Sequence, residues 1–263
     1  MTFQFDRSRI DPAAVEEQDP FVHGQWHNGN PQLKTFGALI IPTKNLPDNL
    51  SPLFLKVWKK DDVVFSTGAI EPCYIATEPL ISVVLKRFTW FLMDAQTRTQ
   101  TYYSYNEFKP GMRGKLHALC GVLGLDEPVV FTFTGEASKA FNNEYKLFKQ
   151  RVVDPLNKVR SERPIPPFAF WMKLKSGPYV TVGDVRKSTV TRPTIVLPDT
   201  ITEEYLTRIQ VKDEVYDRHQ SWYLDPTFKV WSQEWNSGIN KDNPKFVESQ
   251  EPDFQTEPDD FPG

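Results

Sequence analysis

The sequence predicts a β-rich protein of mixed α and β structure, built as a small Greek-key barrel of the OB type elaborated by helices. The 22 prolines among 263 residues limit helix length and favour strands and loops. About six strand-like runs precede the best helical segment, and more follow it. A hydrophobic content of 39% supplies enough apolar side chains for a core. A β-sandwich fits the same pattern almost as well.

The first third of the chain is predicted to contain an irregular arm and four short strands. Residues 1–35 show no regular pattern and form the arm, and residues 36–236 form the β-rich body. The strand-like runs are punctuated by prolines, which mark turns and strand ends. These runs comprise residues 36–41, 53–58, 63–65 and 73–76.

The next segment is predicted to be an antiparallel hairpin. Residues 81–93 are the longest β-rich stretch, and residues 94–96 could turn it into residues 97–105. Residues 115–125 fit either a buried strand or a short helix, because periodicity does not separate the two in so short a run. Residues 129–133 form another strand, which ends at Gly135.

The strongest helical pattern begins near Ser138, which could cap the helix. Pro155 is expected to kink or restart this helix. Apolar residues recur on one helical face at Phe141, Tyr145, Phe148 and Val152.

The last part of the body is predicted to contain further strands and a second helix. Residues 168–175 turn at 176–178 into residues 179–185, and residues 190–197 add a strand. Asp199 or Thr200 could cap a helix over residues 201–218. Regular signals fade from Trp222, although Trp231 and Trp235 are expected to be anchored to the body. Residues 237–263 are polar, acidic and rich in proline, which predicts a disordered tail.

Charge is distributed unevenly along the chain. The net charge is −3, but residues 1–20 and 241–263 contribute −3 and −5, which leaves +5 for residues 21–240. The longest apolar runs are far shorter than a membrane span, and residues 1–20 lack the apolar stretch of a signal peptide. Two cysteines, Cys73 and Cys120, make no disulfide framework. We therefore expect a cytoplasmic protein with reduced thiols.

The sequence contains no phosphate-binding loop, dinucleotide fingerprint, nucleophile elbow or kinase signature. His23 with His27, and His117 with Cys120, are spaced as pairs of metal ligands. Gly24 and residues 28–31 disfavour the helix that would align the first pair, and the second pair has no further pair nearby at the spacing of a metal site. We therefore expect neither an enzyme nor a bound cofactor or metal.

Cations and aromatic residues are interleaved along the predicted hairpin. Aromatic rings can stack on the bases of single-stranded nucleic acid, while cations contact its phosphates. The alternative is that the rings belong to the buried face of a sheet, since aromatic residues are enriched in strands. The candidate binding residues are Lys86, Arg87, Phe88, Trp90, Arg98, Tyr103 and Tyr105.

The C-terminus provides a second candidate site. The chain ends in an acidic segment with an apolar tip, formed by Asp259, Asp260, Phe261 and Pro262. This tail resembles that of bacterial single-stranded DNA-binding proteins, although Gly263 follows the tip. The resemblance implies that these four residues recruit replication or repair proteins. Residues 114–119 are similar to a segment of uncharacterised proteins of cyanobacteria and their phages, which implies no activity.

These features lead to three hypotheses. The first is a binding protein that protects single-stranded DNA or RNA, as a monomer or homo-oligomer, and recruits replication or recombination partners through its tail. The second is a structural or interaction protein, such as a virion component or an assembly adaptor. An enzyme of unfamiliar type ranks below both.

Overall fold

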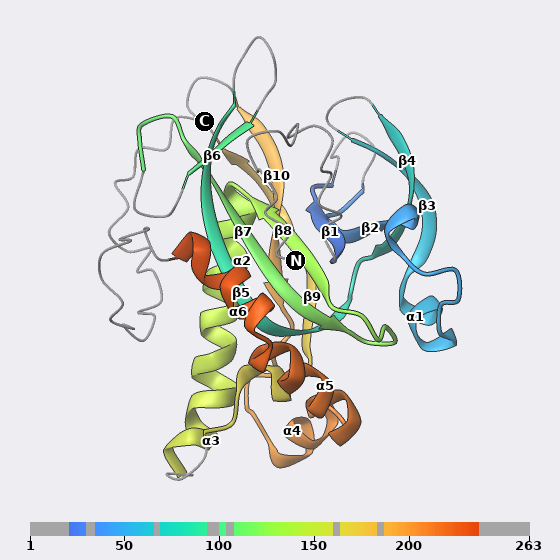
Figure 1. The fold of residues 1–263 in the computed structure, drawn as a ribbon, viewed down its shortest axis with the longest axis vertical. Coiled ribbons are helices and arrows are strands. Elements are labelled where there is room, and N and C mark those ends of the chain that lie inside the picture. The colour runs from blue at the N-terminus through green and yellow to red at the C-terminus, as the bar shows by residue number, and fades with distance from the viewer. Residues whose placement is uncertain are drawn as a thin grey trace, which may run out of the picture.

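A ten-stranded mixed sheet organises the part of the chain that this computed structural model describes, residues 21–29, 35–65, 69–93, 100–103, 108–159, 164–182 and 187–236 (Figure 1). The strand order is β10-β9-β5-β7-β8-β1-β2-β4-β3, and β6 pairs with β5. The neighbours β1 and β8 are parallel, and the other pairs are antiparallel. The predicted β-rich α+β class is confirmed.

The strands vary from short edge segments to the long central β5. In chain order they are β1 (Val22–His27), β2 (Ala38–Pro42), β3 (Lys59–Val64), β4 (Ile70–Ala76), β5 (Leu80–Met93), β6 (Gln100–Tyr103), β7 (Arg113–Val122), β8 (Val129–Thr134), β9 (Met172–Val182) and β10 (Ser188–Ile195).

Helices lie on both faces of the sheet. The helix α2 packs against β8 and β10 on one face, which we call the inner face, whereas α5 and α6 pack against β5 on the other, outer face. The helices are α1 (Pro52–Val57), α2 (Glu136–Phe148), α3 (Asp154–Val159), α4 (Glu203–Ile209), α5 (Asp213–Leu224) and α6 (Pro226–Asn236).

The sheet curls until β10 reaches β1. Trp26 Nε1 on β1 donates a hydrogen bond to the backbone oxygen of Thr191 on β10, at 3.0 Å. The two strands are separated by five strand spacings, about 24 Å in a flat sheet. Figure 1 shows β9 and β10 passing behind β7 and β8.

The curled sheet is not a closed barrel. The strands β10 and β3 end the sheet order, and in the described residues β10 meets β1 through the Trp26 side-chain hydrogen bond rather than through a backbone ladder. The expected OB-type barrel is therefore wrong, and so is its sandwich alternative, because the described strands form one connected sheet. The inner face of the curl holds the main core.

The helix α2 fills the inner face as its apolar stripe predicts. Phe141, Phe148 and Val152 are buried, and the ring of Phe141 stacks on Phe133 of β8 with centroids 3.9 Å apart. The expected interruption at Pro155 is also present. The π-helical residues Lys149–Val153 link α2 to α3, since proline supplies no N–H to a regular α-helical turn.

Two segments expected to be irregular or extended form a different element. Residues 53–58 were expected to be a strand, but residues 53–57 belong to α1 and Trp58 is its C-cap. Ser51 caps this helix by accepting a hydrogen bond from Phe54 N at 3.1 Å, and Pro52 occupies the first turn. Residues 22–27, expected in the irregular arm, form β1 because β2 and β8 offer ladders on both sides.

The predicted turn at residues 176–178 is absent. Instead β9 continues through a β-bulge, in which Gly177 and Pro178 lie opposite Arg192 alone. A bulge tolerates proline because the extra residue is not part of the hydrogen-bond ladder.

The predicted helix over residues 201–218 is divided into α4 and α5. Thr202, rather than Asp199 or Thr200, caps α4. The break between the helices contains Val211, whose N–H donates to the backbone oxygen of Ala169 at 3.0 Å. Regular structure then continues beyond Trp222, which the sequence did not predict, and the anchoring of Trp231 is confirmed because its side chain is buried.

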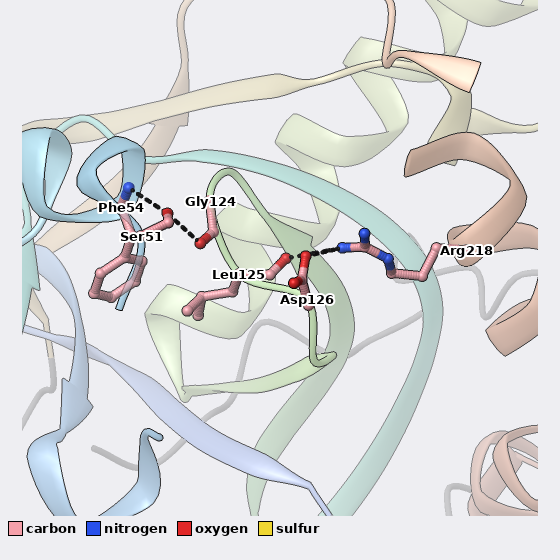
Figure 2. Close-up of polar contacts among 6 residues, drawn as sticks. All are labelled: Ser51, Phe54, Gly124, Leu125, Asp126 and Arg218. Atoms are coloured by element: carbon pink, nitrogen blue, oxygen red, sulfur yellow. Dashed lines mark hydrogen bonds and ion pairs between the residues drawn. The ribbon is translucent and has the colours of Figure 1, made fainter. Parts of the chain in front are cut away.

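The turn between β7 and β8 is held from two sides (Figure 2). Ser51 Oγ donates to the backbone oxygen of Gly124 at 2.6 Å, and Arg218 Nη1 donates to Asp126 Oδ1 at 2.5 Å. Gly124 has φ of 90°, and a Cβ there would lie 2.5 Å from Phe54 N. The turn therefore requires glycine and ties α1 and α5 to the sheet.

Candidate nucleic-acid interface

The predicted hairpin forms, but its two faces have different environments. β5 and β6 pair in antiparallel register, with Trp90 opposite Tyr103. Successive residues of a strand point to opposite faces of the sheet. The candidate residues are therefore divided between the inner and outer faces.

Two candidate rings belong to the inner core. Phe88 and Trp90 are each only 3% exposed and pack edge to face, with centroids 4.8 Å apart. Gly114 on β7 makes room for them, since a Cβ there would lie 2.5 Å from Phe88 Cζ. Our assignment of these two rings to base stacking is therefore corrected: they are core residues, the alternative that the sequence left open.

Lys86 and Tyr103 are also engaged by neighbouring groups. Lys86 Nζ donates to Asn142 Oδ1 at 3.0 Å and lies 4.2 Å from the ring centroid of Tyr145, so it faces α2. Tyr103 is partly buried, and Lys109 Nζ lies 5.0 Å from its ring centroid. The other predicted residues, Arg98, Tyr105, Asp259, Asp260, Phe261 and Pro262, lie outside the described residues.

Arg87 is the candidate residue that belongs to the outer face. It is paired across the sheet with His117 of β7, which is paired in turn with Thr132 of β8. Directly paired residues of antiparallel strands point to the same face. His117 Nδ1 lies 3.0 Å from Thr132 Oγ1, and His117 Nε2 lies 3.4 Å from Thr89 Oγ1. These hydrogen bonds fix the imidazole within a polar row.

Two more cations lie on the outer face, in the cross-strand pairs next to the pair of Arg87 and His117. Lys115 is paired with Thr89 and Thr134, and its Nζ lies 4.7 Å from the ring centroid of Phe91. Arg113, paired with Phe91, is exposed. We refer to Arg87, Arg113, Lys115 and His117 together as the outer cationic face.

The cations of this face are its arginine and lysine side chains, not His117. The pKa of His117 is lowered to about 3, first by burial and then by the charges of Arg87 and Lys115 and by His23. The imidazole is therefore neutral at physiological pH. The positive charge comes from Arg87, Arg113 and Lys115, and the described side chains paired with these residues include no carboxylate. Such a face suits an anion.

The sequence did not point to Arg113, Lys115 or His117 as nucleic-acid-binding residues, and His117 was considered only as a metal ligand. Their spacing of two residues places them on one face of a strand. The signal was hidden because residues 115–125 fitted a helix equally well, and no helix would align these three side chains. The pairing of β7 with β5 and β8 decides the matter.

Helix α6 borders the outer cationic face. The Arg87 guanidinium carbon lies 4.5 Å from the ring centroid of Trp231. Trp231 belongs to a small apolar cluster, separate from the main core, that includes Leu119, Val130 and Trp222. The outer face is thus apolar beneath α5 and α6 and polar beside them.

A buried serine–histidine pair joins β5 to α5. His219 Nδ1 is 2.9 Å from Ser82 Oγ and 3.3 Å from the backbone oxygen of Phe168, and burial lowers the pKa of His219 to about 4. Gly121 leaves space for the ring, since a Cβ there would lie 2.0 Å from His219 Nε2. Both side chains are sealed from solvent, so this pair satisfies buried polar groups and does not face a substrate.

The residue pairs with metal-ligand spacing do not come together as sites. His117 is on the outer face of β7. Cys120 is three residues further along the same strand, so it points to the opposite face and belongs to the inner core. Within the described residues, no group of three or more His, Cys, Asp or Glu side chains is placed to hold a metal ion.

Comparisons with protein-family models, with curated proteins and with solved structures give no match to this chain. In the part of the chain that the structure describes, every helix is too short or too polar to cross a membrane.

Proposed function

We propose that this chain is a cytoplasmic protein that binds single-stranded nucleic acid without catalysing a reaction. The observation that carries this proposal is the outer cationic face, where Arg87, Arg113 and Lys115 project from adjacent strands. Cations at strand spacing can follow the phosphates of an extended polyanion. The acidic, apolar-tipped tail supports recruitment of replication or recombination proteins, as its resemblance implies.

Each group of the face has a distinct role in this proposal. Arg87, Arg113 and Lys115 bind phosphate oxygens, and Arg can do so through two parallel hydrogen bonds. Neutral His117 positions Thr89 and Thr132 by hydrogen bonds rather than adding charge. Affinity should fall as salt rises, because bound phosphates release counterions.

Fluorescence anisotropy with labelled oligo(dT), oligo(rU) and duplex DNA tests the proposal across a salt series. We expect micromolar or tighter binding of oligo(dT) by the wild-type protein. The double variant Arg113→Gln, Lys115→Gln should bind about tenfold more weakly at low salt. Lys56→Gln provides a matched control, because this exposed lysine lies on α1, away from the outer cationic face. Equal affinity of the double variant and the control would rule out this face.

A second candidate function is an interaction or assembly protein. Val64 and Ile70 are directly paired at the end of the β3–β4 hairpin, and their exposed fractions are 60% and 65%. Adjacent exposed apolar side chains are typical of protein contact sites. Light scattering of the wild-type protein and of the Val64→Ser, Ile70→Ser double variant tests this function. A wild-type molar mass above that of a monomer, together with a monomer mass for the variant, would favour assembly.

A further inference from the structure

A pair of stacked rings, of which Phe36 is exposed and Tyr179 half-buried, lies beside the start of β2. Phe36 is 60% exposed, although it is a large apolar side chain. Its ring stacks on that of Tyr179 from β9, with centroids 5.5 Å apart and planes at 23°. One side of the Phe36 ring is therefore supported, while much of the side chain remains in contact with solvent.

The backbone on both sides of Phe36 is anchored. The Tyr179 hydroxyl donates a hydrogen bond to the backbone oxygen of Thr35, and Gly37 N donates to Ser176 Oγ at 3.1 Å. Gly37 also packs closely against β1, since a Cβ there would lie 2.5 Å from Trp26 Cζ2. These contacts fix the position of Phe36 before any ligand arrives, which lowers the entropy lost on binding.

The register places this ring at the same end of the sheet as the outer cationic face. Lys115 is paired with Thr134 on β8, and β1 lies between β8 and β2. Phe36 precedes β2 by two residues, next to the pairing of Ala38 with His27. Measured along the sheet, the backbones of β7 and β2 are three strand spacings apart, ~15 Å. An extended strand of a few nucleotides could span this separation.

We propose that Phe36, supported by Tyr179, is the platform on which a base of the bound single strand stacks; this inference rests on the proposed function. A nucleic-acid site needs an exposed ring as well as cations, and Phe88 and Trp90 are buried in the core. Phe36 supplies an exposed ring at the same end of the sheet as Lys115. Every base has a flat face, so the platform binds without strong sequence preference.

The test compares oligo(dT) with an abasic oligonucleotide of equal length, which keeps the phosphates and lacks the bases. Phe36→Ala should weaken oligo(dT) binding about tenfold and leave abasic binding and the salt slope unchanged. Phe36→Leu, which keeps an apolar side chain without a flat ring, should lose similar affinity. Phe36→Trp should retain wild-type affinity. Tyr223→Ala is the matched control, since Tyr223 is 43% exposed on α5.

The outcomes separate the two proposals. Wild-type affinity for oligo(dT) in both Phe36→Ala and Phe36→Leu would overturn the platform, while weakened binding by the Arg113, Lys115 double variant would keep the proposed function. Equal losses on oligo(dT) and abasic strands would also overturn base stacking. No oligonucleotide binding by the wild-type protein would overturn both. Circular dichroism melts confirm that each variant compared is folded.

Discussion

The inner and outer faces of β5 share one backbone but differ in what covers them. On the inner face, Phe88 is enclosed by the main core and Lys86 is bonded to α2. On the outer face, Arg87 lies in a polar row beside His117 and the edge of α6. Adjacent residues therefore have opposite environments. The difference teaches that the sequence of a strand does not decide whether a ring or a cation is buried or on the surface. That depends on which helix covers its face of the sheet.

The largest expected effect is on the inner face. Phe88→Ala should lower the free energy of unfolding by about 3–5 kcal/mol, because it removes a buried ring and leaves a cavity. Urea denaturation measures the change. Leu55→Ala on α1, where the side chain is exposed, should stay within about 0.5 kcal/mol of wild type. An unaltered stability for Phe88→Ala, together with weaker oligo(dT) binding, would place this ring on the surface after all.

The next largest effect is the loss of folding stability at low pH, which involves His219 in the covered part of the outer face. The pKa of His219 falls from about 6.5 in the unfolded chain to about 4 in the folded protein, because burial disfavours the charged imidazole. The unfolded state therefore binds the proton more readily. The stability from neutral His219 is complete above pH 6.5 and is lost as pH falls towards 4, by about 3 kcal/mol. His117, with a pKa of about 3, acts with the same sign and extends the loss to lower pH.

Urea denaturation between pH 7 and 4 checks this effect. His219→Gln should be less stable than wild type at pH 7, since it loses the fit beside Ser82 and Gly121. Its stability should nevertheless change less with pH. A variant with the same pH dependence as wild type would show that His219 is not the titrating group.

The sharpest comparison uses neighbouring residues of opposite faces. Arg87→Gln should reduce the salt slope of single-strand binding by about 0.7, the value for one lost phosphate contact. Lys86→Gln should leave the slope unchanged and lower stability by about 1 kcal/mol, because it loses the hydrogen bond to Asn142. Anisotropy and urea denaturation on both variants measure the two quantities. Equal slopes for the two variants would contradict the assignment of Arg87 to the binding face.

The smallest effect is expected from the tail. Deleting residues 241–263 removes a net charge of −5 that would compete with nucleic acid for the outer cationic face. Truncation should tighten oligo(dT) binding about threefold at low salt, where charges are least screened, without lowering the melting temperature. Phe261→Ala should keep wild-type strand affinity and abolish recruitment of the tail's protein partner. Identical strand affinities at every salt concentration would show that the tail does not compete.

The candidate site was only partly predictable, because the sequence does not show what covers each face of a strand. Alternation in residues 86–91 shows which side chains share a face of the strand. It does not show which face is buried, because cations and aromatic rings occur on both. Phe36 lay in a predicted strand, but its exposure depends on Tyr179, which is far away in the chain.

The sequence by itself determined the features that depend on local periodicity and on adjacent segments. These are the α+β class, the pairing of β5 with β6 and the buried stripe of α2. Only the tertiary structure decided the curl of the sheet, the insertion of β1 between β8 and β2, and the break between α4 and α5. Each of these depends on hydrogen bonds between distant parts of the chain. A residue's type sets which bonds it can make, but the partner that satisfies them is available only once the chain has folded.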